Sequence, residues 1–532
     1  MSIQFYSNPK GTKPGLVFIF SYTRYFKQTL IREGSSIDRD TLKNLFRGLG
    51  FQKNEIHIKE DLPQRDLFIC LNNIIRFHGY EKYRSLWIFI LTHGRENDFL
   101  YAADAPFHIS KLKLILTSDT KWMGIPKFLI IQACRGYETD EGLKVTGDIC
   151  DNTSDTEEAT SVPYNIPTTS DTIFFHSTWH GFTSYRTSGG SPFIRFFVEN
   201  MRKYFYTDDI IKIFTKICSD VAHNFSATAQ NRPNFIQLKQ MPCFEHSFMY
   251  KLHFGRDLEN KRNQCELKLQ LDRYKMDHKN RGLALFFYQK DYSHHEKMCN
   301  RDADGDVDRL STLLKEFGYK IQIEIDKTEV ELKEILKNVS KYNFSDNDSL
   351  IVIFSGHGLN GKVFLKEGFM YTNEFWDPFT TLNENSLIGK PKLFFISACR
   401  GTMYDKGSFG EFRLPDDPIE CINESEVVTK FESDSDKPLM LPTKADILAV
   451  FSSAEDYISI LDKTQKGTFF LIALHEVLKQ IVDEENIMDV LLRLNENLGK
   501  MITKDLSANK QMSFVMSSLT KELYLSKKKI NK

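Results

Sequence analysis

The stretch Lys127-Phe-Leu-Ile-Ile-Gln-Ala-Cys-Arg-Gly136 decides the fold, and it recurs with substitutions as Lys392-Leu-Phe-Phe-Ile-Ser-Ala-Cys-Arg-Gly401. Each copy is an apolar run of strand length that leads into a cysteine, an arginine and a glycine. An earlier apolar run ends in Thr92-His93-Gly94 in the first copy and in Gly356-His357-Gly358 in the second. The histidine precedes the cysteine by 41 residues in the first copy and by 42 in the second. Matching offsets of this kind indicate a duplicated domain.

The same duplication predicts the domain boundaries. Ser177 corresponds to Ser452, and Lys239-Gln240-Met241 corresponds to Lys510-Gln511-Met512. We expect a first unit at residues 1–254 and a second unit at residues 274–532. The charged stretch between them, residues 255–273, has no long apolar face and is expected to be a linker.

Within each unit, apolar runs of strand length alternate with helical patterns. In the first unit the expected strands are Leu16–Phe20, Ser85–Leu91, Lys127–Ile131 and Thr172–Phe175. The segment Asp38–Leu49 has apolar residues at positions 42, 45, 46 and 49, which is the spacing of one helix face. This alternation predicts an α/β fold with a mostly parallel sheet and helices on both faces. Ligands bind beyond the carboxyl ends of such strands, where His93 and Cys134 would meet if their strands are neighbours.

A thiol beside an imidazole suits acyl transfer, because the histidine titrates near neutrality and can take the proton of the cysteine. The catalytic candidates are Cys134, His93 and Gly94, and the amides of Gly94 and Cys134 are candidates for an oxyanion hole. A single buried cysteine is more often an inert small hydrophobe. The repetition of the whole motif favours the catalytic interpretation.

Composition excludes several other classes of protein. The 532 residues are 41% hydrophobic and carry a formal net charge of -1, so bulk electrostatics gives no reason to expect a nucleic acid or a membrane surface as partner. The apolar runs are too short to span a bilayer, and the first residues do not form a secretory signal. Nine cysteines without CxxC pairs or metal-ligand spacing suggest a reducing compartment. We therefore expect a cytoplasmic protein with no metal and no organic cofactor.

The first unit resembles a caspase over nearly all its length. Gln132-Ala-Cys-Arg-Gly136 is similar to the segment around the caspase nucleophile. Arg32-Glu-Gly-Ser-Ser-Ile-Asp38 is similar to the Arg-x-Gly-Thr-x-x-Asp turn of that family, and Ser184-Tyr185-Arg186 resembles its Ser-Trp-Arg. In the second unit, Tyr274–Asp277 and Ser518–Tyr524 resemble the opening and closing segments of effector caspases. The resemblance implies two α/β/α sandwiches, each with a six-stranded, mostly parallel sheet, and a role in programmed cell death.

The resemblance also implies cleavage after aspartate. Fixed arginine side chains would hold the substrate carboxylate, since a guanidinium group can donate two parallel hydrogen bonds to it. The substrate-binding residues carried over by motif position are Arg32, Gln132, Ser184, Tyr185 and Arg186.

The second unit departs from this pattern. Ser397 replaces Gln132, and Leu461 replaces Arg186. In the turn, Arg301 lies seven residues before Asp308, whereas Arg32 of the first unit lies six residues before Asp38. Asp304 and Asp306 are expected beside the pocket, where they would repel an acidic substrate. The dyad Cys399 and His357 is kept, so this unit is either a degenerate caspase, which we prefer, or a hydrolase with another specificity.

Caspases are matured by cleavage between a large and a small subunit, and the resemblance places these parts here. The expected large-subunit parts are residues 1–137 and 274–402, the linkers are 138–171 and 403–445, and the small-subunit parts are 172–254 and 446–532. Glu138–Glu158 is polar and acidic, as expected of a solvated loop. The cleavage candidates are Asp148, Asp151 and Asp155, of which Asp151 and Asp155 are preferred.

The sequence therefore predicts an aspartate-directed cysteine endopeptidase that acts on protein substrates through its first unit. The alternative is a non-enzymatic regulator, in the manner of FLICE-like inhibitory proteins, that pairs with other caspases. Caspases dimerise through late strands of the small subunit, which correspond to Met241–Leu252 and Met512–Leu523. We expect these two segments to pair within the chain, whereas the alternative is two independent units that each dimerise with another chain.

Overall fold

The structure is a computed structural model of the chain. It describes residues 4–6, 12–26, 31–118, 121–141, 143–144, 167–187, 189–228, 237–255, 268–296, 298–380, 386–405, 440–503 and 509–527.

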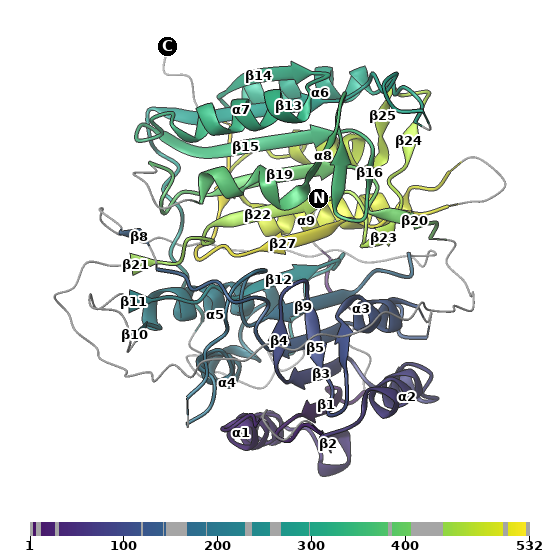
Figure 1. The fold of residues 1–532 in the computed structure, drawn as a ribbon, viewed down its shortest axis with the longest axis vertical. Helices are drawn as coiled ribbons and strands as arrows, with labels where there is room; N and C mark the ends of the chain where they lie inside the picture. The colour runs from purple at the N-terminus through teal and green to yellow at the C-terminus, as the bar shows by residue number, and fades with distance from the viewer. Residues whose placement is uncertain are drawn as a thin grey trace.

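One twelve-stranded sheet runs through the whole molecule (Figure 1). Its strands in spatial order are β14 (Tyr319–Ile325), β13 (Asn280–Tyr288), β15 (Asn347–Ser355), β19 (Lys392–Ser397), β22 (Ile447–Phe451), β27 (Phe514–Ser517), β12 (Cys243–His246), β9 (Thr172–His176), β7 (Lys127–Gln132), β3 (Leu86–Leu91), β1 (Leu16–Ser21) and β2 (Ile56–Glu60). The first unit contributes the six strands from β12 to β2, and the second unit contributes the other six. Within each half five strands are parallel, and only β12 or β27 runs antiparallel to its neighbour.

The inner strands are apolar on both faces because helices cover both faces of the sheet. Every residue of β3 and β7 is buried. Trp87 on β3 stacks on Phe128 of β7, with ring centroids 3.7 Å apart. These strands therefore read as continuous apolar runs in the sequence instead of alternating patterns.

Nine α-helices pack on this sheet: α1 (Ser35–Gly48), α2 (Gln64–Ile75), α3 (Ser110–Thr117), α4 (Pro192–Tyr204), α5 (Ile210–Asn224), α6 (Asp304–Glu316), α7 (Glu329–Ser340), α8 (Phe469–Lys479) and α9 (Ile487–Lys500) among the described residues. Helices α1, α4, α5, α6, α8 and α9 share one apolar core that spans both units. On the opposite face α2 and α3 cover the first unit, while α7 and two 3-10 turns, η4 (Thr372–Phe375) and η5 (Asp377–Phe379), cover the second. Two further 3-10 turns lie at η1 (Lys53–Glu55) and η2 (Tyr80–Lys82).

Short strands build the loops around the main sheet. In the first unit they are β4 (Gly94–Arg95), β5 (Phe99–Tyr101), β6 (Pro106–His108), β8 (Leu143–Lys144), β10 (Ala227–Thr228) and β11 (Gln237–Leu238). In the second unit they are β16 (Gly358–Leu359), β17 (Lys362–Phe364), β18 (Phe369–Tyr371), β20 (Gly401–Met403), β21 (Met440–Leu441), β23 (Asp456–Tyr457), β24 (Leu461–Asp462), β25 (Gly467–Thr468), β26 (Glu485–Asn486) and β28 (Tyr524–Leu525). β8 pairs with β21, so the two units also exchange hydrogen bonds through segments that follow their cysteines.

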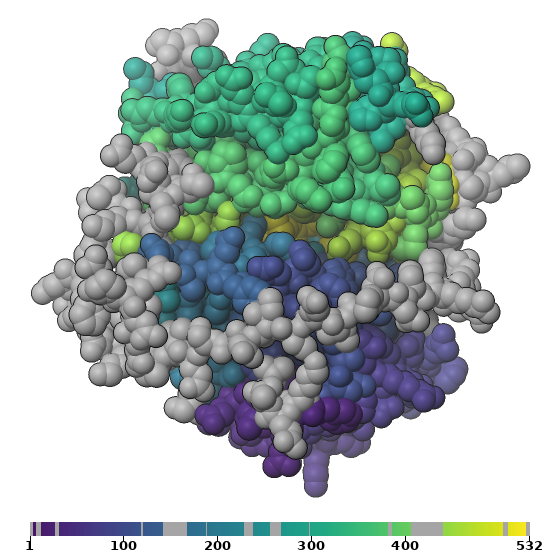
Figure 2. All heavy atoms as spheres, in the orientation of Figure 1, coloured from purple at the N-terminus to yellow at the C-terminus, as the bar shows by residue number. Residues whose placement is uncertain are grey.

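The two halves of the sheet join where β12 pairs antiparallel with β27, and Glu245 lies opposite Met516. Figure 1 shows these strands side by side where the purple-to-teal half meets the green-to-yellow half. Figure 2 shows the two halves packed directly against each other. Both strands lie in the segments for which the sequence predicted pairing within the chain, and that strand pairing is present.

The predicted fold class is confirmed, and the strand bounds differ from the expected runs by only a residue at either end. The helix expected over Asp38–Leu49 begins earlier, at Ser35, directly after Gly34 in the left-handed conformation. Among the described residues, no helix is long and apolar enough to cross a membrane.

Candidate active site

The cysteine and histidine of the first unit lie at the same edge of the sheet. β3 and β7 are parallel neighbours, with Leu91 opposite Gln132, so the chain leaves both strands side by side. His93 and Cys134 each follow their strand by two residues. A Cβ atom on Gly94 would collide with the carbonyl oxygen of Cys134. Only glycine allows the two loops to approach this closely.

The sulfur of Cys134 is half-buried and is held by the chain at Ser184. The amide nitrogen of Ser184 lies 3.4 Å from Sγ, and Sγ lies 3.5 Å from the carbonyl oxygen of Ser184. Ser177 fixes the turn below, since its hydroxyl accepts from the amide of Ala133 and donates to the carbonyl oxygen of Ala133.

A tyrosine that the sequence analysis missed positions His93. The amide of His93 donates to the Tyr25 hydroxyl over 3.1 Å, and the two ring centroids are 5.2 Å apart. The same hydroxyl lies 2.9 Å from Oγ1 of Thr92. The sequence held a signal for this residue, because Tyr292 recurs in the second unit and makes the same bond to the amide of His357.

The predicted pocket residues of the first unit lie together beside Cys134. Arg32 is fully buried, donates to Ser35 Oγ over 2.6 Å, and reaches the carbonyl oxygen of Gln132 over 3.4 Å. Burial lowers the pKa of Arg32 to about 10, and the neighbouring positive charge of Arg186 adds to that effect. The side-chain amide of Gln132 donates to Ser184 Oγ over 3.0 Å.

Tyr185 lies in the wall of this pocket. Its ring is buried and packs on Phe225 with centroids 5.2 Å apart. Its amide donates to Oε1 of Gln240 over 2.8 Å, and Gln240 in turn donates to the carbonyl oxygen of Ser177. From the sequence, Gln240 was identified only as part of the repeated Lys239-Gln240-Met241 segment. The structure adds it to the residues that hold the pocket wall.

The second unit repeats the scaffold around its cysteine. Sγ of Cys399 lies 3.2 Å from the amide of Ser459, as Cys134 does from Ser184. The amide of Ile460 donates to Gln511 as Tyr185 does to Gln240. Leu461 therefore occupies the position of Arg186, as the motif alignment predicted.

The histidine of the second unit is held through one of its ring nitrogens. Nε2 of His357 donates to the carbonyl oxygen of Cys299 over 2.9 Å. Burial lowers the pKa of this histidine, which favours the neutral ring. This bond engages one ring nitrogen and leaves the lone pair of Nδ1, so it orients the ring without blocking its action as a base.

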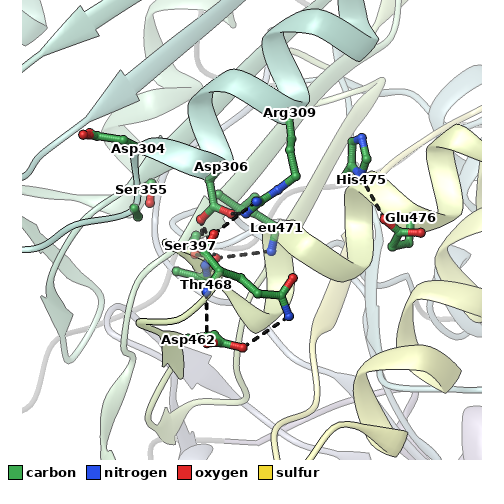
Figure 3. Close-up of polar contacts among 12 residues, drawn as sticks. Asp304, Asp306, Arg309, Ser355, Ser397, Asp462, Thr468, Leu471, His475 and Glu476 are labelled. Carbon is green, nitrogen blue, oxygen red and sulfur yellow. Dashed lines mark hydrogen bonds and ion pairs between the residues drawn. The ribbon is translucent and has the colours of Figure 1, made fainter.

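The pocket position of the second unit is filled by its own polar contacts (Figure 3). Ser397 Oγ lies 3.0 Å from Thr468 Oγ1. The carboxylate of Asp306 accepts from the amide of Thr468 over 2.7 Å and from Arg309 Nη2 over 3.0 Å. Arg301 donates to Ser355 Oγ over 3.3 Å. No second arginine stands at the place of Arg186, which is Leu461.

One part of the motif alignment was wrong. Asp38 accepts from the amide and hydroxyl of Ser191, and Asp306 accepts the same two bonds from Thr468. Asp306, not Asp308, is therefore the counterpart of Asp38. Arg301 lies five residues before it, one residue fewer than in the first unit instead of one more. Asp306 belongs to the framework of the turn, where it is fully buried and hydrogen-bonded.

This framework predicts a pH-dependent contribution to stability. Burial raises the pKa of Asp306 from 3.8 to about 6. The protonated carboxyl therefore contributes stability that is present below about pH 4 and is lost as the pH rises through 6, at a cost of about 3 kcal/mol. Asparagine loses the ion pair with Arg309 but does not titrate, so we expect the melting temperature of the parent to fall relative to that of Asp306→Asn as the pH rises from about 4 to 6. The exposed neighbour Asp304→Asn is the control, and an equal pH-dependent gain there would contradict the assignment.

The cleavage candidates Asp148, Asp151 and Asp155 lie outside the described residues. The described residues contain no group of three or more histidine, cysteine, aspartate or glutamate side chains that could hold a metal ion.

Comparison with known proteins agrees with this geometry. The caspase domain model matches residues 14–254 and again 281–524, and the chain therefore belongs to the caspase family, a family of cysteine peptidases. Caspase-3 of Bos taurus is 32% identical over 257 residues, which are 47% of this chain and 86% of the relative. Caspase-6 of Bos taurus is 31% identical over 252 residues, 45% of this chain and 84% of the relative. Caspase-1 of Spodoptera frugiperda is 28% identical over 263 residues, 48% of this chain and 82% of the relative.

Among solved structures, the crystal structure of caspase-1 from Spodoptera frugiperda is similar, with 26% sequence identity and a TM-score of 0.41. It covers 51% of this chain and 99% of its own chain.

Proposed function

We propose that this chain is a cysteine endopeptidase that cleaves proteins after aspartate through its first unit, residues 1–254. The second unit, residues 274–532, would serve as its built-in partner across the linker at residues 255–273. The observation that carries the proposal is the group of Arg32, Gln132 and Arg186 beside Cys134. The second unit keeps the cysteine and Arg301, the counterpart of Arg32, but has Ser397 and Leu461 at the positions of Gln132 and Arg186.

The two guanidinium groups of the first unit favour an anion between them. Arg32 is fully buried, and the charge of Arg186 lowers its pKa further. A substrate carboxylate would relieve this repulsion and accept paired hydrogen bonds. A neutral side chain such as asparagine would leave the buried Arg32 and the partly buried Arg186 without a carboxylate between them.

The chemistry follows from the placement of the two loops. His93 takes the proton of Cys134, and the thiolate attacks the substrate carbonyl carbon to form a tetrahedral intermediate. The amides of Gly94 and Cys134 would stabilise its oxyanion. His93 then gives the proton to the leaving amine, and water releases the acid from the thioester with His93 as base. The bond from His93 to Tyr25 supports the loop orientation that these steps require.

The second unit would support the loop that follows Cys134 without cutting substrate. Asp140 accepts from the amide and the hydroxyl of Thr443 of the second unit, each over 2.9 Å. In return, Asp405 accepts from the amide and hydroxyl of Thr168 of the first unit, over 3.2 and 3.1 Å. Each segment that follows a cysteine is thereby bound to the other unit.

Maturation by cleavage within residues 138–171, after Asp151 or Asp155, belongs to the same proposal. It rests on the acidic composition of Glu138–Glu158 and on family membership. Family membership also supports programmed cell death as the process served.

The purified full chain tests the proposal. It is expected to hydrolyse fluorogenic peptides that end in aspartate, and to do so far better than the matching asparagine or lysine peptides. The intact mass of the same preparation should show cleavage between residues 138 and 171. Absence of hydrolysis, with the fold confirmed by circular dichroism, would contradict the proposal.

The alternative function is a non-enzymatic regulator that pairs with other caspases. Ser397 in place of Gln132 and Leu461 in place of Arg186 favour this role for the second unit. The complete pocket of the first unit does not favour it for the chain as a whole.

A further inference from the structure

We infer that the junction between β12 and β27 selects for two unlike units, so that the first unit pairs with the second unit of its chain and not with another first unit. The inference concerns an interaction surface and its partner. It does not depend on whether the chain cleaves substrate.

The two units are related by an approximate two-fold axis, which lies between Glu245 and Met516 at the junction. Glu245 of β12 lies opposite Phe174 on β9, and Met516 of β27 lies opposite Ala449 on β22. Phe174 lies three residues before Ser177, and Ala449 lies three residues before the corresponding Ser452. Glu245 and Met516 therefore occupy equivalent positions in the two units. They also lie opposite each other across the junction.

This register determines what a pair of two first units would contain. Met516 would be replaced by a second Glu245, so that two carboxylates, each bound to the Lys113 of its own unit, would face each other on adjacent strands. Like charges directly opposite in an antiparallel pair are destabilising. In this chain, Glu245 instead faces the uncharged Met516.

On one side of the junction, a buried lysine of α3 forms ion pairs with a carboxylate of each unit. Nζ of Lys113 lies 3.0 Å from Oε2 of Glu245 and 3.2 Å from Oε2 of Glu455. Lys113 lowers the pKa of Glu455 to about 2, which shows how strongly the two are coupled. Glu455 lies three residues after Ser452, and the corresponding residue of the first unit is His180. Burial lowers the pKa of His180, so a pair of first units would offer Lys113 a neutral ring in place of a carboxylate.

The opposite side of the junction depends on the first unit. Trp376 of the second unit meets Trp179 of the first unit edge to face, with ring centroids 6.2 Å apart, and Met516 packs on the same cluster. The residue of the second unit that corresponds to Trp179 is Ala454. Two second units would therefore place Ala454 against Trp376 and leave a cavity the size of an indole ring.

The two sides together exclude both like pairs. One side holds a charge bridge that needs Glu455 of the second unit, and the other holds an aromatic contact that needs Trp179 of the first. Only the unlike pair has both.

Cutting the folded chain tests this selection directly. A site for a specific protease is placed between residues 255 and 273 of the full chain, and two preparations, one labelled with ¹⁵N, are cut and mixed. Native mass spectrometry is expected to show pairs of one first and one second unit, including pairs of mixed label, with unlike pairs favoured about tenfold or more. Pairs of two first units in the proportion expected of random association, or units that do not pair, would overturn the inference.

Charge variants of the uncut chain give an independent measurement. Met516→Glu places a second carboxylate opposite Glu245, without the second Lys113 that another first unit would bring. It is expected to lower the melting temperature by about 4 °C or more, whereas Met516→Gln, of the same size, should have little effect. Adding Glu245→Gln to Met516→Glu should restore most of the loss, because it removes the repulsion. A loss that is equal in the Gln variant, or that persists in the double variant, would reflect burial of a polar group alone and would overturn the inference.

Discussion

Replacing Cys134 with alanine is expected to abolish peptide hydrolysis, with a loss of several orders of magnitude in kcat/KM. The loss of a nucleophile removes the covalent step, and the remaining binding groups cannot replace it. The measurement is hydrolysis of a fluorogenic peptide that ends in aspartate by the purified full chain. The fold should be unchanged, because the bonds that hold this turn run from the backbone of Ala133 to Ser177.

Cys399→Ala is the matched control, since the chain supplies a second cysteine in the same scaffold. Its activity should stay within about twofold of the parent, because Ser397 and Leu461 replace two of the pocket residues of the first unit. A comparable loss in both variants would contradict the assignment of catalysis to the first unit. Loss only in Cys399→Ala would reverse it.

The sequence was sufficient for the fold because the apolar runs are long and buried on both faces. β7 occupies Lys127–Gln132 and β9 occupies Thr172–His176, each within a residue of the expected run. The repetition of these runs in the second unit supplied the domain count. The pairing of β12 with β27 could also be anticipated, because the resemblance to caspases marks these late segments as dimer strands. Both also carry β-forming, largely uncharged residues that would otherwise leave an exposed sheet edge.

Parts of the site were not predictable from motif spacing. The turn of the second unit has one residue fewer between Arg301 and its aspartate, and an alignment by residue type chose Asp308 in place of Asp306. Only the hydrogen bonds to Thr468 distinguish the two. Tyr25 acts through the backbone of His93, so in the sequence only its recurrence as Tyr292 in the second unit could have indicated it.

The side-chain contacts across the junction could not be predicted from the sequence. Lys113 and Glu455 are 342 residues apart in the chain, and each alone is typical of a solvated surface. Whether these two residues form an ion pair at the junction depends on how β12 and β27 pair. The register of that pair also determines whether Glu245 faces a methionine or another carboxylate. Residue composition can predict that two edges pair, but not which side chains then oppose each other.

The preference for aspartate should depend on Arg186. Arg186→Leu gives the first unit the residue that the second unit has at Leu461, and the shared contacts of Tyr185 and Ile460 indicate that the same backbone accommodates either side chain. Arg32 would then face the substrate carboxylate alone, without the second guanidinium. A desolvated charge pair contributes about 3–5 kcal/mol, so we expect the discrimination between aspartate and asparagine peptides to fall by roughly two orders of magnitude or more.

The comparison that isolates this effect uses Arg186→Lys beside Arg186→Leu. Lysine keeps the positive charge but cannot donate paired hydrogen bonds in a plane, so its discrimination should lie between that of the parent and that of the leucine variant. Both variants are assayed on the aspartate peptide and its asparagine counterpart, so that a general loss of activity cancels in the ratio. If Arg186→Leu still prefers aspartate by more than about 100-fold, the pocket does not work through this arginine. Arg32 and Gln132 would then have to hold the carboxylate by themselves, and Leu461 would no longer be a reason to expect the second unit to be inactive.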